Sequence, residues 1–514
     1  MKSTVAPVPG MRQIENSRPP QGEPMAIIDV GSNSIRMVIF ASQGHYPYPL
    51  FNERANCRLG EGVGGDGMLQ EERIRVALAT LARFAKILGD MGISKIHAFA
   101  TAAVRRAKNA EQFTRPAAVL LNQEISVLSQ QEEAYHVARG LTLNLPRATG
   151  LVADLGGGSI EIIKLKNGQI KQSTSFDFGH LSDVKRSEVD DAFEGTDWIS
   201  GASPKRLYGV GGSFRAFASA YIEQSGYPLP VLHGLTVPKK AAKGLLATFT
   251  GRSPELGGVP LGRRKTMPTA AKIIDCLLDH CGAKEIYISG TSIRDGVLSE
   301  RELKDDERAD MLRVLCGEIS RASHRFAGVP DSLFRFLRPL GESLAGASGK
   351  TNKARRQKFE RLLQAACLMS DLCWNEHEDI RGEIGAKRVL GLPVNCVSHK
   401  ERIWLATAIY HRYVGHKTNK SRPPELGAIL GQKRRSEAAT IGLGLRFALM
   451  FSGGTAHCLE YLSLTNEAGV LTLPVTEQGR SLLDKHSCRR FAQLAQSASL
   501  IPEIEQAQNQ TGPK

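Results

Sequence analysis

The feature that most constrains the fold of this chain is a short unit that occurs twice. Residues 28–39 read IDVGSNSIRMVI, and residues 153–164 read ADLGGGSIEIIK. The two segments align without gaps at an offset of 125 residues (153 minus 28), and an aspartate, a glycine, a serine and an isoleucine recur at equivalent positions. Each copy has two apolar runs around a glycine turn, which is typical of an antiparallel hairpin. The repeat therefore predicts two similar lobes, each presenting one hairpin to a shared cleft.

The second copy carries the clearest chemical signal. Residues 151–165 read LVADLGGGSIEIIKL, with three glycines between two apolar runs. The bare amides of such a turn form a concave surface that binds anions, which predicts a phosphate site. Asp154 precedes the glycines and Glu161 follows them, so both carboxylates can flank one phosphate. Phosphate oxygens with one or two carboxylates are the ligands that Mg²⁺ prefers.

Length and composition limit what surrounds these hairpins. The 514 residues have room for about three domains, and no apolar run is long enough to span a bilayer, so we expect a soluble protein without a membrane partner. Nine cysteines without a C-x-x-C pair fit free thiols in a reducing cytoplasm, which is the expected location. The net charge of +15 favours a polyanionic partner, either nucleic acid or an inorganic polyanion. Residues 1–24 are expected to be a disordered tail.

The segment between the hairpins reads as a helix and two strands. Apolar spacing predicts a helix over 71–89, and short strands are expected at 96–100 and 125–128. Arg105 and Arg106 follow the first of these strands, at the strand end that leads into the expected cleft. This position favours phosphate binding by the two arginines. The alternative is ordinary charge on a helix surface.

A helix is predicted to open at Ser129, in the segment SQQEEAYHVARG. Ser129 and Glu132 have the S-x-x-E spacing of a capping box, which gives Glu132 a structural role and leaves Glu133 available. A carboxylate in the first turn of a helix that faces a phosphate cleft is a suitable general base for activating water. The alternative is that both glutamates only complement the helix dipole.

Two further glycine turns follow at strand ends, in 207–216 and 286–295. With the two hairpins they predict an α/β protein with a cleft between its lobes. Gly211, Gly212 and Ser213 receive only a supporting role, because packing glycines give the same pattern.

From about residue 305 the composition changes and helical patterns dominate, for example at 361–374 and 401–413. Basic clusters lie at 353–358, 411–422 and 433–435, and with Arg263, Arg264 and Lys265 they would line a track for a long anion. Solvated helix faces are the alternative. The histidines at 377, 399, 411 and 416 match no zinc spacing, so satisfied or surface histidines are expected.

Six motifs occur in the order seen in a known family. They are DVGSNS (29–34), RLGEG (58–62), ATAAVRRAKN (100–109), EEA (132–134), DLGGGSIE (154–161) and GVGGS (209–213). In order and spacing they resemble the exopolyphosphatase and guanosine pentaphosphate phosphohydrolase (Ppx/GppA phosphatase) family. The resemblance implies the actin, sugar-kinase and Hsp70 ATPase superfamily fold, with ribonuclease-H-like lobes at 25–145 and 146–305. An all-α, HD-like domain at 306–500 and a tail at 501–514 would follow.

The resemblance also implies roles for individual residues. Glu133, the second glutamate of EEA, would be the catalytic base, and Arg105 would contact phosphate. Asp154 and Glu161 would bind Mg²⁺ or another divalent cation such as Mn²⁺. The remaining phosphate-binding residues would be Asn33, Ser34, Gly157, Gly158 and Ser159, with Gly212 and Ser213 in support.

The third domain departs from the longer family members. Where they carry a His-acid pair, this chain has Ser370-Asp371, which argues against HD-type metal chemistry. We therefore expect an anion-binding module that also forms a homodimer.

The expected activity is stepwise, processive hydrolysis of the terminal phosphoanhydride of inorganic polyphosphate, releasing orthophosphate. The nearest alternative substrate is guanosine pentaphosphate, and a more distant alternative is a nucleotide-dependent kinase or nucleotide-binding module on the same fold. Nucleic-acid binding is disfavoured, because only 6% of the residues are aromatic and no aromatic-basic interleaving appears.

Overall fold

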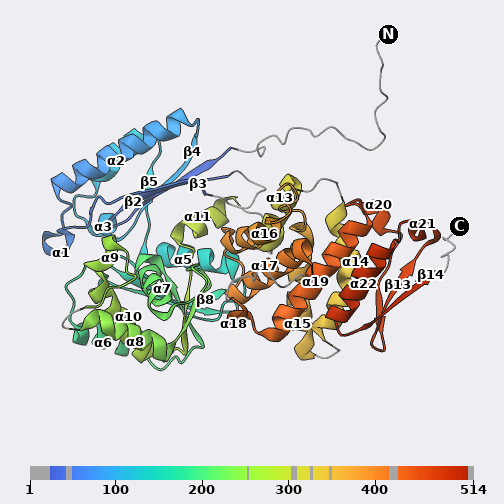
Figure 1. Ribbon diagram of the computed structural model, residues 1–514. Coiled ribbons are helices and arrows are strands. Elements are labelled where there is room, and N and C mark those ends of the chain that lie inside the picture. The colour runs from blue at the N-terminus through green and yellow to red at the C-terminus, as the bar shows by residue number, and fades with distance from the viewer. Residues whose placement is uncertain are drawn as a thin grey trace, which may run out of the picture.

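The computed structural model describes residues 23–41, 49–251, 254–302, 310–323, 328–346, 350–415 and 426–506. It contains two α/β lobes and a mostly helical third region, which extends to one side of them (Figure 1). In the described part of the chain, no helix combines the length and the apolar character that crossing a bilayer requires. All nine cysteines are free thiols, as the sequence predicts.

The first lobe is built on a five-stranded sheet with the order β3-β2-β1-β4-β5. The strands are β1 (Met25–Val30), β2 (Ile35–Phe40), β3 (Pro49–Ala55), β4 (Lys95–Ala100) and β5 (Ile125–Val127). β1, β2 and β3 form an antiparallel meander, whereas β4 and β5 run parallel to β1. This order and these directions are those of a ribonuclease-H-like fold.

The second lobe repeats the same pattern. Its strands are β6 (Gly150–Leu155), β7 (Ile160–Lys166), β8 (Gln169–Phe176), β9 (Arg206–Val210), β10 (Thr236–Pro238) and β11 (Glu285–Ile288). The order is β10-β11-β9-β6-β7-β8, with β6, β7 and β8 antiparallel and β9 and β11 parallel to β6. Strand β10 is an antiparallel addition at the edge. The duplication inferred from the two hairpins is therefore confirmed.

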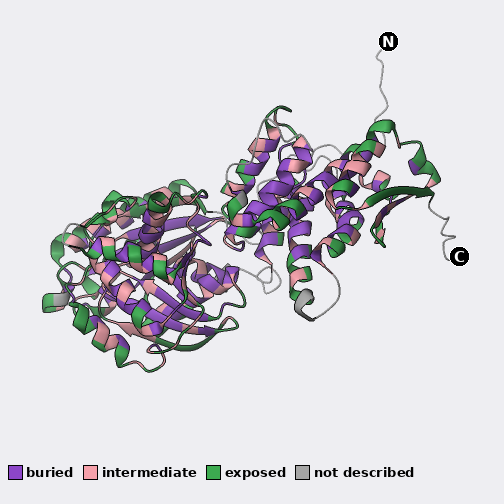
Figure 2. Ribbon diagram, turned by 60° about the horizontal axis from the view of Figure 1, so that its bottom comes forward, coloured by how far each residue is buried: buried purple, intermediate pink, exposed green. Residues whose placement is uncertain are grey.

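Each sheet buries one face under its own outer helices. The helices of the first lobe are α1 (Val63–Asp66), α2 (Glu71–Asp90), α3 (Ala102–Arg106) and α4 (Glu111–Leu121). Those of the second lobe are α6 (Arg186–Glu194), α7 (Gly211–Ser225), α8 (Lys239–Thr250), α9 (Leu261–Arg264) and α10 (Met267–Cys281). Because successive side chains of a strand alternate between faces, Ala26, Ile28 and Val30 pack toward the outer helices. Figure 2 shows the buried strands enclosed by helices with exposed outer surfaces.

The inner faces of the two sheets share one core with two more helices, α5 (Gln130–Asn144) and α11 (Ile293–Glu302). Met25 and Ile27 of the first sheet belong to the same buried cluster as Val152 and Ile163 of the second. Helix α5 packs on β7 and β8, and α11 packs on β1, so each of these helices contacts the sheet of the other lobe. The lobes are therefore joined through a common hydrophobic layer.

Two glycines allow α5 and α11 to approach closely. A Cβ at Gly296 would lie 1.8 Å from the carbonyl oxygen of His136, and a Cβ at Gly140 would lie 2.5 Å from that of Ser292. No larger residue fits at these two contacts without moving a helix backbone.

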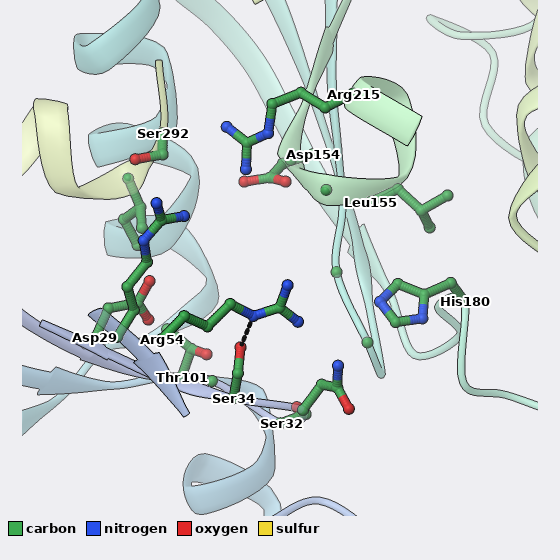
Figure 3. A pocket seen from close by; sticks show the side chains of 18 of the residues that line it. Asp29, Ser32, Ser34, Arg54, Thr101, Asp154, Leu155, His180, Arg215 and Ser292 are labelled. Atoms are coloured by element: carbon green, nitrogen blue, oxygen red, sulfur yellow. Dashed lines mark hydrogen bonds between the residues drawn. The ribbon is translucent and has the colours of Figure 1, made fainter. Parts of the chain in front are cut away.

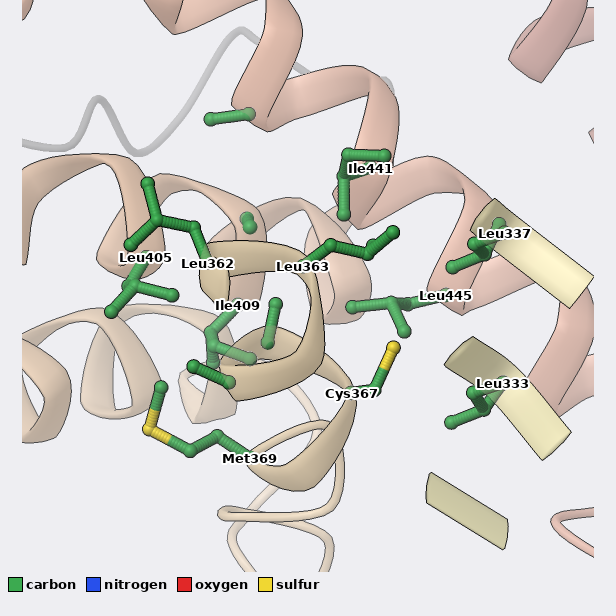
Figure 4. Packing of buried hydrophobic residues seen from close by; sticks show 14 of the residues in the cluster. Leu333, Leu337, Leu362, Leu363, Cys367, Met369, Leu405, Ile409, Ile441 and Leu445 are labelled. Carbon is green, nitrogen blue, oxygen red and sulfur yellow. The ribbon is translucent and has the colours of Figure 1, made fainter. Parts of the chain in front are cut away.

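The third region is a helical assembly around its own apolar core, part of which Figure 4 shows. Its helices are α13 (Met311–Ser323), α14 (Val329–Ala345), α15 (Lys350–Leu368), α16 (Arg381–Gly391), α17 (His399–Val414), α18 (Gly427–Leu430), α19 (Gln432–Phe451), α20 (Ala456–Leu459), α21 (Glu477–Arg480) and α22 (Lys485–Ser497). Asp371 is buried and pairs with Arg412 at 3.2 Å, so its carboxylate is used inside the core.

The region is not purely helical, which corrects one sequence expectation. It ends in a three-stranded sheet of β12 (Thr465–Glu467), β13 (Val470–Val475) and β14 (Ile501–Gln506), in which β14 runs parallel to β13. Residues 501–506 are thus a strand and not the start of a tail. Their side chains are all exposed, so the strand is held by backbone pairing to β13 and gives no apolar alternation in the sequence.

Histidine 399 links the third region to the second lobe. Its Nε2 lies 3.0 Å from the carbonyl oxygen of His233, and its Nδ1 lies 2.9 Å from the hydroxyl of Tyr227. Burial lowers the pKa of His399 to about 4, so the ring is neutral, with Nε2 donating and Nδ1 accepting. The expectation of a satisfied histidine is confirmed here, whereas His416 lies outside the described residues.

Candidate functional site

A cavity of about 520 Å³ lies between the lobes, and both hairpin turns line it. Figure 3 shows Arg54 and Ser34 of the first lobe with Asp154, His180 and Arg215 of the second lobe around this space. Polar residues from both lobes therefore line one cavity, where the sequence predicts a shared cleft.

The two turns have the same backbone geometry. The amide of Gly31 donates to the carbonyl oxygen of Ser34 at 3.1 Å, and the amide of Gly156 donates to that of Ser159 at 2.9 Å. The turns also face each other, because a Cβ at Gly157 would lie only 3.4 Å from the Cβ of Ser32. Small residues at these positions keep the space between the turns open for a ligand.

Each turn is braced by a loop of its own lobe. In the first lobe, Gly60 of the RLGEG segment donates its amide to the carbonyl oxygen of Ser32 at 2.8 Å. In the second lobe, His180 and Leu181 donate their amides to the carbonyl oxygens of Gly156 and Gly157 at 3.1 and 2.9 Å. These bonds fix the carbonyl groups of the turns, which orients the intervening amides.

Glu133 lies in the first turn of α5 and lines the cavity. The capping box between Ser129 and Glu132 is present, as the sequence predicts. Glu133 is not free, because Nη1 of Arg105 donates to its carboxylate at 2.8 Å and to the carbonyl oxygen of Leu128, also at 2.8 Å. Burial raises the pKa of Glu133 to about 7, despite the opposing effect of Arg105. Such a carboxylate exchanges protons near neutral pH.

Asp154 and Glu161 are direct cross-strand neighbours in the β6–β7 hairpin. Glu161 is only 1% exposed and accepts hydrogen bonds from Ser159 (2.7 Å) and Ser175 (3.2 Å). Burial raises the pKa of Asp154 to about 6, with a further contribution from Asp29. Burial and then the charges of Glu133 and Asp154 raise the pKa of Glu161. Two neighbouring acids in a site of this kind repel each other when both are ionised, so a positive charge beside them would stabilise the ionised pair.

This donor set fits a divalent cation. Among the described residues, no three acidic, histidine or cysteine side chains converge as a complete metal cage. Mg²⁺ usually binds through one or two carboxylates together with substrate phosphate oxygens, and it keeps several waters. Asp154 on the cavity wall and Glu161 beside it supply two such carboxylates.

Gly211 holds the Asp154 side of the cavity open. It has a φ of +90°, and a Cβ there would lie 2.5 Å from Oδ1 of Asp154. At the next residue, a Cβ at Gly212 would lie 2.2 Å from Nη2 of Arg263. The glycines that begin α7 therefore permit a carboxylate and a guanidinium to approach the backbone.

The structure brings most of the predicted residues to the cavity wall. Those that line it are Asn33, Ser34, Glu133, Asp154, Gly157, Ser159 and Gly212. Arg105 and Glu161 lie behind the wall and contact lining residues. Gly158 is not among the lining residues, although a Cβ there would lie 3.8 Å from the hydroxyl of Ser32. Ser213 is 2% exposed and also absent from the wall, because its side chain is buried at the start of α7, so its contact with phosphate stays a prediction.

Sequence reasoning missed most of the positive charge of the cavity. Five arginines line it, namely Arg36, Arg54, Arg215, Arg263 and Arg294. They come from separate elements, so only the folded chain shows them as a group. Arg36, Arg215 and Arg294 nevertheless share a local pattern, because each follows a serine and one apolar residue after a turn. Arg36 also occupies the position of the first hairpin that corresponds to Glu161 at the 125-residue offset (36 plus 125), and Arg263 belongs to a basic cluster that the sequence assigns to an anion track.

Several of these arginines are held by neutral or acidic partners. Arg54 donates to the hydroxyl of Ser34 at 3.0 Å, and Arg294 pairs with Asp29. Nη1 of Arg263 lies 2.8 Å from Nε2 of His180. Burial and the charge of Arg263 lower the pKa of His180 to about 3, so its Nε2 accepts this bond as part of a neutral ring.

Comparison with known proteins finds related families and individual relatives. Residues 38–305 match the Ppx/GppA phosphatase family, and residues 341–501 match the family described as exopolyphosphatase, C-terminal. A guanosine-5'-triphosphate,3'-diphosphate pyrophosphatase of Pseudoalteromonas translucida is 27% identical over 298 residues, which cover 54% of this chain and 59% of that protein. A protein of the same name from Pseudoalteromonas atlantica is 26% identical, with 55% of this chain and 60% of the relative covered. The matches thus span less than two thirds of the length of these curated relatives.

Solved structures match a similar share of the chain. An exopolyphosphatase from Cytophaga hutchinsonii is 24% identical with a TM-score of 0.49, covering 54% of this chain and 96% of that one. A Ppx/GppA family member from Aquifex aeolicus is 24% identical with a TM-score of 0.46, covering 54% and 97%. Because the family match over residues 38–305 takes in more than half of the sequence, the chain belongs to the Ppx/GppA phosphatase family.

Proposed function

We propose that this protein is an exopolyphosphatase, which hydrolyses the terminal phosphoanhydride of inorganic polyphosphate and releases orthophosphate. The observation that carries the proposal is the composition of the cavity wall, where a set of arginines faces a group of buried carboxylates. The arginines suit several phosphate groups at once, and the carboxylates suit a water and a divalent cation. Phosphoryl transfer depends mainly on positioning and electrostatic stabilisation, which these groups provide.

In this mechanism Glu133 orients and deprotonates the attacking water. Arg105 holds the Glu133 carboxylate at 2.8 Å and fixes its direction. The amides of the two hairpin turns and the guanidinium of Arg54 bind the phosphoryl oxygens and offset their developing charge. Asp154 and Glu161 would hold a divalent cation such as Mg²⁺ or Mn²⁺, which supplies further charge stabilisation when it is bound.

Guanosine pentaphosphate is the alternative substrate. Both curated relatives described above are named guanosine-5'-triphosphate,3'-diphosphate pyrophosphatases, which favours it. Against it, the described residues of the cavity wall include no phenylalanine, tyrosine or tryptophan on which a guanine would stack. A kinase-like nucleotide module has no need of a base at Glu133, and we rank it below both phosphatase activities.

One assay separates these activities. Orthophosphate release is measured from long-chain polyphosphate, guanosine pentaphosphate and ATP, each with Mg²⁺ or with EDTA. The proposal expects Mg²⁺-dependent release with a kcat/KM for polyphosphate at least tenfold above that for guanosine pentaphosphate. A preference for guanosine pentaphosphate would establish the alternative, and release from none of the three would refute both.

We also propose that the active form is a cytoplasmic homodimer. The homodimer rests on the sequence prediction for the third region, and the cytoplasmic location rests on the nine cysteines without a C-x-x-C pair. Light scattering on the full chain tests it, and a monomeric mass at micromolar concentration would refute it.

A further inference from the structure

A second cavity, of about 210 Å³, adjoins the catalytic one at the junction of both lobes with the third region. Arg36, Arg215, Ser292 and Arg294 line both cavities, so they form the boundary between the two spaces. The wall of the second cavity also includes Asn395, which comes from the third region between α16 and α17.

Three asparagines supply amide donors to this cavity. Asn144, at the end of α5, is only 7% exposed, and its side chain forms no hydrogen bond with any residue in the described ranges. Asn52 accepts a bond from Nε of Arg36 at 2.8 Å through its oxygen, which leaves its NH₂ group to donate. Asn395 likewise forms no side-chain hydrogen bond within the described part of the chain. Asn144 is buried, whereas Asn395 is half-buried and Asn52 is exposed, so Asn144 gains most from a ligand or water that accepts its hydrogen bonds.

The charge of the cavity is positive. Arg215 makes no hydrogen bond or ion pair with a described residue, although Asp154 and Asp295 influence it electrostatically. Burial is the main cause that lowers the pKa of Arg36 to about 10. Repulsion by the charges of Arg294 and Arg215 lowers it further. Asp295 is the one acid among the described residues of the wall, and it already accepts bonds from the amide and hydroxyl of Ser292, each at 2.8 Å. Asp29, which pairs with Arg294, offsets part of this charge from the side of the first cavity, yet the three guanidinium groups outnumber Asp29 and Asp295. Guanidinium and amide donors with this excess of positive charge match a tetrahedral oxyanion.

We propose that the second cavity is an oxyanion subsite of the phosphate class, separate from the catalytic subsite and reached past Arg36, Arg215 and Arg294. Its occupant is one phosphoryl unit, either the orthophosphate just released or the next group of the substrate chain. Binding of an oxyanion is inferred from the residues of the cavity alone, whereas its identity as product or substrate rests on the function proposed above. Through Asn395, the third region takes part directly in holding the anion.

The first test measures binding without catalysis. Equilibrium dialysis of radiolabelled orthophosphate against the full chain, at constant ionic strength and with EDTA, should give two binding events for the wild type. Asn144→Asp keeps the size of the side chain but places a carboxylate against the anion, so the second event should weaken by about tenfold or more. Asn395→Asp should weaken the second event in the same way, and it serves as the test variant if Asn144→Asp does not fold. The control is Asn375→Asp, which adds the same charge at an exposed position of the third region.

Circular dichroism and the melting temperature must show that each variant is folded. A single event in the wild type, or unchanged binding in folded variants of both cavity asparagines, would overturn the subsite. This arm does not depend on turnover, so its outcome stands even if no substrate is hydrolysed.

The second test identifies the occupant. If the subsite receives the product, Asn144→Asp should raise the inhibition constant of orthophosphate about tenfold. The ratio of the KM for long chains to the KM for tripolyphosphate should then stay unchanged. If it holds the chain, the variant should raise the KM for long chains relative to tripolyphosphate and leave orthophosphate inhibition unchanged. Effects on neither quantity, in an active variant, would contradict any role of the cavity in the reaction.

Discussion

The two lobes present the same hairpin with opposite charge. At the offset of 125 residues, Asp29 corresponds to Asp154 and Arg36 corresponds to Glu161. In the first lobe the cross-strand pair is Asp29 with Arg36, which is electrostatically favourable. In the second lobe it is Asp154 with Glu161, which places two acids directly opposite each other in a buried site. The backbone has been kept while the charge at one position has been inverted.

This difference indicates a division of labour between the lobes. A pair of like charges across a hairpin destabilises the fold, so it persists where binding a cation compensates for it. The first lobe instead contributes Arg36 and Arg54 to the cavity wall and suits the anion. If Asp154 and Glu161 hold a cation as proposed above, the duplicated unit supplies an anion-binding wall and a cation-binding wall to the same cavity.

The largest effect is expected at the acid between the lobes. Glu133→Gln removes the proton acceptor but keeps the hydrogen bond from Arg105, so kcat should fall by about 10²–10⁴-fold while substrate still binds. Steady-state kinetics and direct polyphosphate binding measure the two quantities. The control is Glu132→Gln, one residue earlier, which alters the exposed capping box and should leave kcat within about twofold. Near-normal turnover in Glu133→Gln would remove this residue from the mechanism.

The next test compares the two equivalent positions directly. Glu161→Gln should raise the Mg²⁺ concentration needed for half-maximal activity by about 10–100-fold and change the KM for substrate little. Arg36→Gln should do the reverse, because it removes positive charge from the anion-binding wall. Titrations of Mg²⁺ and of polyphosphate for both variants give the comparison. The same pattern of change in the two variants would contradict the division of labour.

The acid cluster should also make stability depend on pH. The folded pKa of Glu133 (about 7) and of Asp154 (about 6) lie above their usual values, so both groups favour folding when protonated. Their contribution is fully present below about pH 4 and is lost as pH rises through 6 and 7. In EDTA, the free energy of unfolding should therefore fall by about 4 kcal/mol between pH 5 and 8, and Glu133→Gln should reduce this fall. Chemical denaturation at several pH values measures it, and equal slopes in both proteins would contradict the prediction.

The smallest effect concerns the glycine beside Asp154. Gly211→Ala combines a left-handed backbone with a clash against the carboxylate, whereas Gly226→Ala has a similar φ of +62° and open space around it. Both changes should destabilise the protein by about 1 kcal/mol through the backbone. Only Gly211→Ala should also weaken Mg²⁺ activation, since it displaces Asp154. Unchanged Mg²⁺ dependence in that variant would show that the carboxylate can move without loss.

The sequence was sufficient for features that are local along the chain. The hairpins, the capping box at Ser129 and the glycine turn at Gly211 each depend on a few consecutive residues, so their patterns predicted the observed structures. Arg54 and Arg215 come from β3 and α7 and reach the hairpin turns only in the folded chain, whereas Arg263 of α9 belongs to a basic cluster that the sequence assigns to an anion track. The exchange of α5 and α11 between the lobes escaped prediction for the same reason, because its signal is the spatial meeting of two glycines far apart in sequence.

The shared layer of α5 and α11 has a mechanical consequence. Glu133 is carried by α5, a first-lobe helix that packs on β7 and β8 of the second lobe, and its carboxylate is bonded to Arg105 of its own lobe. The start of α5 is tied to the first lobe, because Arg105 also donates to the carbonyl oxygen of Leu128 and the amide of Leu128 donates to that of Ala100. The tight contact at Gly140 and Gly296 leaves α5 and α11 little room to slide past each other, so elements of both lobes fix the position of Glu133.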